Sequence, residues 1–487
     1  MRLVQTGAVL VAGAVLAGCG AGYRPVVTPI NPSGPASQPQ AFVGVVSAPS
    51  PTAPGILTVV DYSGDTIMAQ APIGPGPLSF TLDATGSNGY TLNSDGTLTN
   101  FQVNSTFQAK NIQYTTLPTT ADVVNIFSPS AGLWTADLSG NVIDVLTGFP
   151  GTFKLAVPVA PTPVMIVGPS VVGQRNYAIA QNVTDSTGVA CNISPRTVTV
   201  NGQAEAIEQA TLTVSATIPL GKCPVYGIES PDARRVFVLN RGDDTISVIN
   251  SQTNTLDNQC PPPAGCFNQA GQQYFSHPSL PLSTSAGLTG ANVPSIAGPV
   301  YAEYNATTQQ LVVANYDGNT VSVIDVSLDT YGNDSATFGT TFTIPVGGNP
   351  ASVTALYDGS RAYTANQADG TVSEVNLVSH TPVKTLPVNG HPRTVVSVQN
   401  SLYGKVYVAS PDSPYLTIIR TDQDIIDATV LVSGNIVDVR ASNQNGSSGN
   451  SIVTSRKPGY GEPCYLPPTL LSPTVILASP SLCATLP

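Results

Sequence analysis

The chain has 487 residues, and only 10% of them are charged, where a soluble domain usually carries about 25%. Its net charge of −11 leaves no basic face, so nucleic-acid binding, which depends on clustered lysines and arginines, is disfavoured. Hydrophobic residues make up 41%, enough for a core, and the 44 glycines and 43 prolines stay below the share of about 25–30% that marks a disordered chain.

The amino terminus has the pattern of an export signal. Residues 3–16 are mostly apolar, and this stretch is too short for a mature membrane span. It leads into the sequence LAGC, ending at Cys19, which resembles the bacterial lipoprotein box. The resemblance implies that residues 1–18 are a lipoprotein signal peptide and that a lipid on Cys19 anchors the protein to a membrane. An ordinary signal peptide with an incidental cysteine is the alternative.

The resemblance also bears on location. Gly20 stands where such lipoproteins often carry an aspartate for retention at the inner membrane, so we expect an outer-membrane or cell-surface protein. Residues 19–40 are rich in proline, glycine and serine without apolar periodicity, and they are expected to form a flexible tether.

The main body of the chain is built from a repeat. Four 15-residue segments align without a gap: VFVLNRGDDTISVIN from Val236, LVVANYDGNTVSVID from Leu311, AYTANQADGTVSEVN from Ala362 and VYVASPDSPYLTIIR from Val406. Each has two β-rich runs around a turn, which predicts a hairpin. The fifth residue is asparagine and the tenth is threonine in three segments. This pattern favours hydrogen bonds within the turn over a repeated ligand site.

A second element recurs further along each unit. The segments QAPIGPGP, TIPLGKCP, TIPVGGNP and TLPVNGHP, which begin at residues 70, 217, 343 and 385, each lead into another β-rich run. A hairpin, a third strand ending in this proline–glycine segment and a fourth strand predict a four-stranded blade, and the period of about 40–50 residues is typical of a β-propeller. The longest interval between hairpins indicates an insertion at about residues 256–299.

Weaker copies precede the four clear ones. They begin at Phe42, Gly89, Leu133 and Asn176, which gives eight units between about 42 and 445. Discarding one degenerate copy would leave seven. We therefore predict an all-β fold, a β-propeller of four-stranded blades covering residues 41–457, with seven or eight blades and eight preferred. Residues 451–455 are a candidate strand for closing the ring.

The repeat can also be compared with a known family. Strings such as VYVAS, LVVANYDGNTVSVID and TIPVGGNP resemble the YVTN β-propeller repeat of bacterial and archaeal surface-layer and exported proteins. The match is good over roughly residues 215–435 and holds only in outline elsewhere. The resemblance implies a propeller, usually seven-bladed, with suspected binding or cell-surface roles. Packed blades and neutral polar loops would also explain the low charge.

Residues 458–487 form a proline-rich tail. Two of its residues, Cys464 and Cys483, belong to the six cysteines that remain when Cys19 is set aside. An even number in an exported protein suggests disulfides, although six cysteines allow 15 connectivities. Proximity in the sequence favours three pairs: Cys191 with Cys223, Cys260 with Cys266, and Cys464 with Cys483.

The sequence carries little catalytic equipment. Its three histidines, His277, His380 and His391, are expected in separate loops, and common nucleophile, metal and nucleotide motifs are missing. We predict no catalytic residues, no cofactor and no metal site, although the acidic turns at Asp243-Asp244 and Asp317 would suit calcium.

The leading functional hypothesis is a lipid-anchored binding or scaffold module at the cell envelope. Its loop faces would take a protein, glycan or small ligand, and an enzyme is the less favoured interpretation. A lactonase-like propeller hydrolase, with acidic, histidine or arginine groups at one end of the channel, is one alternative. A structural surface-layer component is the other.

Overall fold

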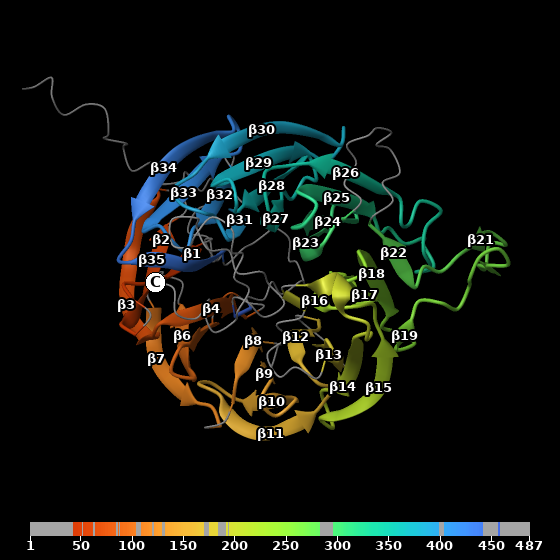
Figure 1. Cartoon of the computed structure of the whole chain (residues 1–487), viewed down its shortest axis with the longest axis horizontal. Coiled ribbons are helices and arrows are strands. Elements are labelled where there is room, and N and C mark those ends of the chain that lie inside the picture. The colour runs from red at the N-terminus through yellow and green to blue at the C-terminus, as the bar shows by residue number, and fades with distance from the viewer. Residues whose placement is uncertain are drawn as a thin grey trace, which may run out of the picture.

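The structure is a computed structural model, and it shows eight four-stranded antiparallel β-sheets arranged in a ring (Figure 1). We call the centre of the ring, toward which the innermost strands lie, the channel. It describes residues 42–457 except 51, 62–63, 84–85, 87, 104–108, 119–120, 129–131, 170–174, 184–190, 193, 283–295, 399–403 and 442–455. The predicted β-propeller is confirmed, and of the two blade numbers eight is right. The signal peptide, tether, tail and candidate strand 451–455 lie outside the described residues, as do Cys19, Cys464 and Cys483.

Each blade runs from an innermost strand beside the channel to an outermost strand on the rim (Figure 1). Blades one to four, in that order within each blade, contain β35(Asn435–Ala441), β1(Phe42–Ala48), β2(Pro54–Asp61) and β3(Thr66–Pro75); β4(Pro77–Leu82), β5(Asn88–Asn93), β6(Thr97–Val103) and β7(Ala109–Thr116); β8(Val123–Phe127), β9(Leu133–Asp137), β10(Val142–Thr147) and β11(Thr152–Pro158); and β12(Pro163–Val167), β13(Arg175–Ala180), β14(Gln203–Glu208) and β15(Thr213–Pro219).

Blades five to eight continue the ring. They contain β16(Pro224–Glu229), β17(Arg235–Asn240), β18(Thr245–Asn250) and β19(Thr255–Leu256); β23(Pro299–Asn305), β24(Gln310–Asn315), β25(Thr320–Asp325) and β26(Thr341–Pro345); β27(Pro350–Ala355), β28(Arg361–Asn366), β29(Thr371–Asn376) and β30(Thr381–Pro387); and β31(Thr394–Val398), β32(Lys405–Ala409), β33(Tyr415–Arg420) and β34(Ile425–Leu431). A short 3₁₀ helix, η1(Pro195–Thr197), lies between β13 and β14.

The boundaries of the blades differ from the boundaries of the sequence repeats. The repeated hairpin forms the second and third strands of a blade, and the next strand is its outermost one. The strand after the proline–glycine segment, however, is the innermost strand of the following blade, so the prediction that the four strands of one unit form one blade is wrong by one strand. The last unit therefore supplies β35, which pairs with β1 and closes the ring. This arrangement protects the strand edges that an open sheet would expose.

The buried core follows from this layering. Inner strands such as β8, β9 and β16 are buried at every position, because both faces of each blade pack against neighbouring blades. Outermost strands such as β11 and β15 are mostly exposed, with one buried residue each. About three strands in four thus need apolar or neutral side chains, which accounts for the low charge of the chain.

The predicted insertion interrupts the outermost strand of blade five. β18 pairs with β19 at one end and with β22(Ser279–Pro281) at the other, so these two short strands together take the place of one outer strand. Between them the chain leaves the ring and forms the hairpin of β20(Cys266–Phe267) and β21(Gln273–Tyr274), which projects outward from the rim (Figure 1). The insertion is therefore attached at the rim and leaves the blade register unchanged.

Candidate functional site

The asparagine and threonine of the repeat form a local hydrogen-bond unit. In blade seven, Asn366 Nδ2 donates to Thr371 Oγ1 at 3.0 Å and to Ser373 Oγ at 2.9 Å. Asn240 and Asn315 make the same pair of bonds in blades five and six, and Asn93 does so in blade two. The prediction of turn hydrogen bonds is confirmed, and these side chains serve the fold.

The same unit holds the linker that arrives from the preceding blade. The N–H of Gly347 donates to Ser373 Oγ at 3.1 Å, and the N–H of Gly348 donates to Asp369 Oδ2 at 2.6 Å. A Cβ atom at Gly347 would lie 2.6 Å from Asn366 Nδ2, so only glycine fits there. We call this arrangement of linker glycine, asparagine and turn aspartate the blade joint. Its counterparts at Gly221 and Gly74 explain the glycine of the proline–glycine segments.

The acidic turns considered for calcium have other partners. Asp243 accepts from Lys222 N and Thr245 Oγ1, whereas Asp244 accepts from Arg196 and from two backbone N–H groups. Asp317 binds the guanidinium of Arg241 through both oxygens, at 2.7 and 3.1 Å. Their carboxylates thus complete blade joints and ion pairs, and the described residues contain no cluster of three or more metal-ligating side chains.

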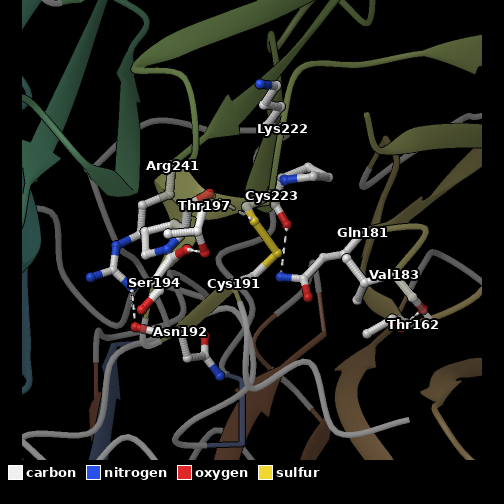
Figure 2. The surroundings of a disulfide bond; sticks show 12 residues. Thr162, Gln181, Val183, Cys191, Asn192, Ser194, Thr197, Lys222, Cys223 and Arg241 are labelled. Atoms are coloured by element: carbon white, nitrogen blue, oxygen red, sulfur yellow. Dashed lines mark hydrogen bonds between the residues drawn. A yellow bond between two sulfur atoms is a disulfide. The ribbon is translucent and has the colours of Figure 1, made fainter. Parts of the chain in front are cut away.

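Two of the three predicted disulfides are present. The Cys191–Cys223 bond is fully buried and links the segment between β13 and β14 to the linker before β16 (Figure 2). Beside it, Arg241 Nη1 donates to the carbonyl of Asn192 at 3.0 Å, and Gln181 Nε2 donates to the carbonyl of Pro224 at 3.3 Å. The Cys260–Cys266 bond closes a short loop in the insertion.

The histidines do not come together. His391 lies on the face that carries the blade joints, where its Nδ1 is 2.6 Å from Asp412 Oδ2. His380 occupies the turn between β29 and β30 on the opposite face, where it stacks on Phe342 with ring centroids 3.6 Å apart and burial lowers its pKa.

The third histidine, His277, belongs to the insertion. It contacts Asp334 Oδ2 at 2.8 Å, and Arg235 bridges Asp334 and Asp257 at 3.0 and 3.1 Å. Burial, and then the neighbouring Asp334, raise the pKa of Asp257 to about 6. This network fastens the insertion to blades five and six, far from the channel.

The channel contains a cluster that the sequence analysis missed. In the part of the chain that the structure describes, each innermost strand pairs within its sheet on one side only, so its carbonyl groups on the channel side need other donors. Arg393, just before β31, donates through Nη1 to the carbonyls of Val437 at 3.2 Å and Leu78 at 3.5 Å. Arg456 donates through its two terminal nitrogens to the carbonyls of Val225 and, at 2.9 Å, Val300. Guanidinium groups thus satisfy carbonyl oxygens of blades one, two, five and six.

A third arginine extends the cluster across the channel. Arg440 on β35 donates to the carbonyl of Phe80 at 3.1 Å and to Asp438 Oδ2 at 3.2 Å, while its Nη1 has no hydrogen-bond partner. Burial lowers its pKa, but Asp438 and two tyrosines outweigh burial and leave the pKa raised, so Arg440 remains charged.

The two tyrosines come from blades five and six, on the opposite side of the ring. The rings of Tyr226 and Tyr301 are 4.8 Å apart, and the guanidinium of Arg456 lies 5.0 Å above the ring of Tyr226. Burial raises the pKa of Tyr226 to about 12, although Arg456 and Arg440 oppose this shift. Burial raises the pKa of Tyr301 as well, so both phenols stay neutral, buried beside the arginines.

Arg456 and Lys457 follow the ring-closing strand β35 in the chain, and we call residues 456–457 the channel strap. The strap is extended and forms a β-bridge with Asn125 of β8. The N–H of Lys457 donates to the carbonyl of Val124 at 2.8 Å, and Lys457 Nζ lies 3.0 Å from Asp122 Oδ1. The carbonyl of Arg456 accepts from Arg393 Nη2 at 2.6 Å. The strap thereby reaches blades three, five, six and eight.

One sequence signal for this cluster exists. The run Val437-Asp438-Val439-Arg440 alternates apolar and charged residues, which places both charges on one face of a strand. The tyrosines on the opposite side of the ring, Tyr226 and Tyr301, lie more than a hundred residues before Arg440 in the chain and share no repeated pattern with it. They come close to Arg440 only when the ring closes.

No helix among the described residues is long and apolar enough to cross a membrane. No protein-family model and no curated protein matches the chain.

Solved structures do match it. Apo AztD from Citrobacter koseri is similar over 86% of this chain and 99% of its own, with 12% identity and a TM-score of 0.53. Dihydro-heme d1 dehydrogenase NirN in complex with DHE matches over 83% of this chain and 76% of its own, with 12% identity and a TM-score of 0.54. A 6-phosphogluconolactonase-like protein from Bacteroides fragilis reaches a TM-score of 0.48 at 15% identity, covering 84% of this chain and 99% of its own, too low to support an argument. At such identities the first two show a shared fold alone, and the likeness to the YVTN repeat stays a prediction.

Proposed function

We propose that the protein is a lipid-anchored binding or scaffold module outside the cytoplasm that presents its loop surfaces to a protein, glycan or small ligand. The observation that carries this proposal is the burial of the charged groups on the channel side of the blades, since Arg393, Arg440 and Arg456 are each no more than 5% exposed and bind backbone carbonyls. The loops on the two faces and the projecting insertion offer exposed surface to a partner, including Phe267 and Val378.

The disulfides support the location. Buried and loop-closing disulfides persist in oxidising compartments and are rare in the reducing cytosol. Both cysteine pairs in the described residues are bonded, which is compatible with an exported protein. The short apolar signal ending at Cys19 supports export independently.

The anchor has a direct test. Cys19→Ser removes the sulfur that would carry the lipid, so we expect the variant to move from the membrane fraction to the soluble extracytoplasmic fraction. Cell fractionation with immunoblotting measures this. Retention of the variant in membranes at the level of the unchanged protein would contradict the anchor.

Binding by a loop surface can be tested by site-specific photo-crosslinking in intact cells. One probe replaces Phe267, at the insertion tip and 68% exposed, and a matched probe replaces Val378, in a turn of blade seven and 74% exposed. A discrete crosslinked species from one position and not the other would locate the partner surface. Robust lactone turnover by the purified protein, with no crosslinked species at either position, would favour the lactonase-like alternative. Concentration-dependent self-association would favour the surface-layer alternative.

A further inference from the structure

The channel strap is held in the manner of a bound peptide. An extended peptide is commonly recognised by backbone pairing with a free strand edge, combined with specific contacts to its side chains. Here the free edge is that of β8, to which the strap adds through its bridge to Asn125 and the bond from Lys457 N to the carbonyl of Val124. The carbonyl of Arg456 is also bound, by Arg393.

The arginine side chain is recognised by its shape as well as its charge. Its two terminal nitrogens donate to the carbonyls of Val225 and Val300, which belong to the innermost strands of adjacent blades. The central carbon of the guanidinium lies over the ring of Tyr226, 5.0 Å from its centroid. A fork of two donors with a flat cationic face fits such a site, and an ammonium group offers neither feature.

The lysine adds a second charged contact. Lys457 Nζ lies 3.0 Å from Asp122, whose side chain is 39% exposed at the entrance to the site. Arg456, by comparison, is 2% exposed. The site thus combines a buried arginine anchor, paired backbone and a peripheral carboxylate for the following lysine.

We propose that the central channel is a recognition site for an extended Arg-Lys peptide segment, that the strap is its resident occupant, and that an Arg-Lys segment of a partner protein can take the strap's place. The strap competes from within the same chain, at an effective concentration on the order of millimolar. A partner segment therefore binds measurably only when it is tight or when the strap has been removed.

The test uses the full-length chain and a fluorescent peptide with the sequence IVTSRKPGY, which corresponds to residues 452–460. The test compares the unchanged chain with an Arg456→Ala/Lys457→Ala variant. Fluorescence polarisation should show the peptide binding the variant at least about tenfold more tightly than the unchanged chain, because the variant's strap has lost the side chains that compete for the site. A peptide with alanine in place of arginine should bind the variant about tenfold more weakly.

Two aspartate substitutions, one inside the proposed site and one outside it, provide the control. In the double-alanine variant, Asp122→Asn should weaken binding by a factor of about two to ten, whereas Asp95→Asn, in an exposed turn of blade two, should leave it unchanged. Equal affinities of both peptides for the double-alanine variant, or no binding by either, would overturn the proposal.

A second measurement addresses the case in which the double variant does not fold. If circular dichroism shows the double variant unfolded, the variant is refolded with excess peptide. Recovery of the β signal with the arginine peptide and not with the alanine peptide would support the site. Failure with both would overturn it.

Discussion

Buried carboxylates stand at the blade-joint position in two of the four blades whose sequence copies are weak. By strand register, Asp144 in blade three and Glu205 in blade four occupy the position of Ser247 and its counterparts. Glu205 still accepts from a linker N–H, that of Ala160, at 3.1 Å, so a carboxylate replaces the hydroxyl of the blade joint. In blade four the joint is thus kept by a different side chain from that of the clear repeats.

Asp144 should make stability depend on pH. Burial, and then Asp137, raise its pKa from 3.8 to about 6, so the folded state holds a proton that the unfolded state releases between about pH 4 and 6. Its contribution to stability is therefore lost as the pH rises through that range. Asp144→Asn should stabilise the protein by about 1–3 kcal/mol at pH 8 and by much less at pH 4.

Urea unfolding at the two pH values measures this difference. Asp95→Asn, at an exposed turn, serves as the control and should change little at either pH. An Asp144→Asn effect that is the same at pH 4 and pH 8 would contradict the raised pKa.

Among the elements, the blade joint is where sequence analysis succeeded best. The asparagine–threonine spacing predicted turn hydrogen bonds, and the hairpins, their turns and two disulfides followed from local sequence. The blade boundary was misplaced by one strand because hydrogen bonding between the first and second strands of a blade leaves no mark on the repeat period. The channel cluster was missed because it joins residues from five blades and the strap, which local patterns do not connect.

The close packing in the blade joint can be measured with a double-mutant cycle. Gly347→Ala places a Cβ atom against Asn366 and should destabilise the protein by about 1–3 kcal/mol. Asn366→Ala removes the two nearest of the atoms that this Cβ would meet, so the glycine substitution should cost at least about 1 kcal/mol less in that background.

Chemical denaturation of the four proteins gives the coupling. Gly64→Ala is a suitable control, since the nearest atom to its new Cβ is 3.5 Å away. Additive effects of Gly347→Ala and Asn366→Ala would show that the linker does not press on the asparagine.

The disulfides should differ in their contributions. Cys191 and Cys223 are 32 residues apart, and Cys260 and Cys266 are 6 apart. On the chain-entropy relation the longer loop stabilises by about 3.7 kcal/mol and the shorter by about 2.2 kcal/mol. Replacing each pair with serines should therefore lower the melting temperature more for the first pair, as measured by calorimetry. A larger loss from the Cys260 and Cys266 replacement would contradict this order.

At the scale of the whole molecule, ring closure rests on β35. A chain ending at Ser433 lacks the innermost strand of blade one, and we expect it to lose cooperative unfolding because that blade and its neighbours expose apolar faces. A chain ending at Ala441 keeps β35 but lacks the channel strap, so it should unfold cooperatively at a lower temperature. Calorimetry of both truncated chains separates the contribution of β35 to ring closure from the contribution of the strap to stability. Identical unfolding transitions of the two chains would show that β35 is not the closing element.

The one-strand offset between sequence unit and blade has a consequence for how such a chain changes in evolution. Each unit supplies three strands of one blade and the first strand of the next, so duplication or loss of a whole unit leaves every blade with four strands. The end of the chain would still meet its beginning within a single sheet. Ring size can therefore change by one blade in one genetic event, without an intermediate that leaves a strand edge unpaired.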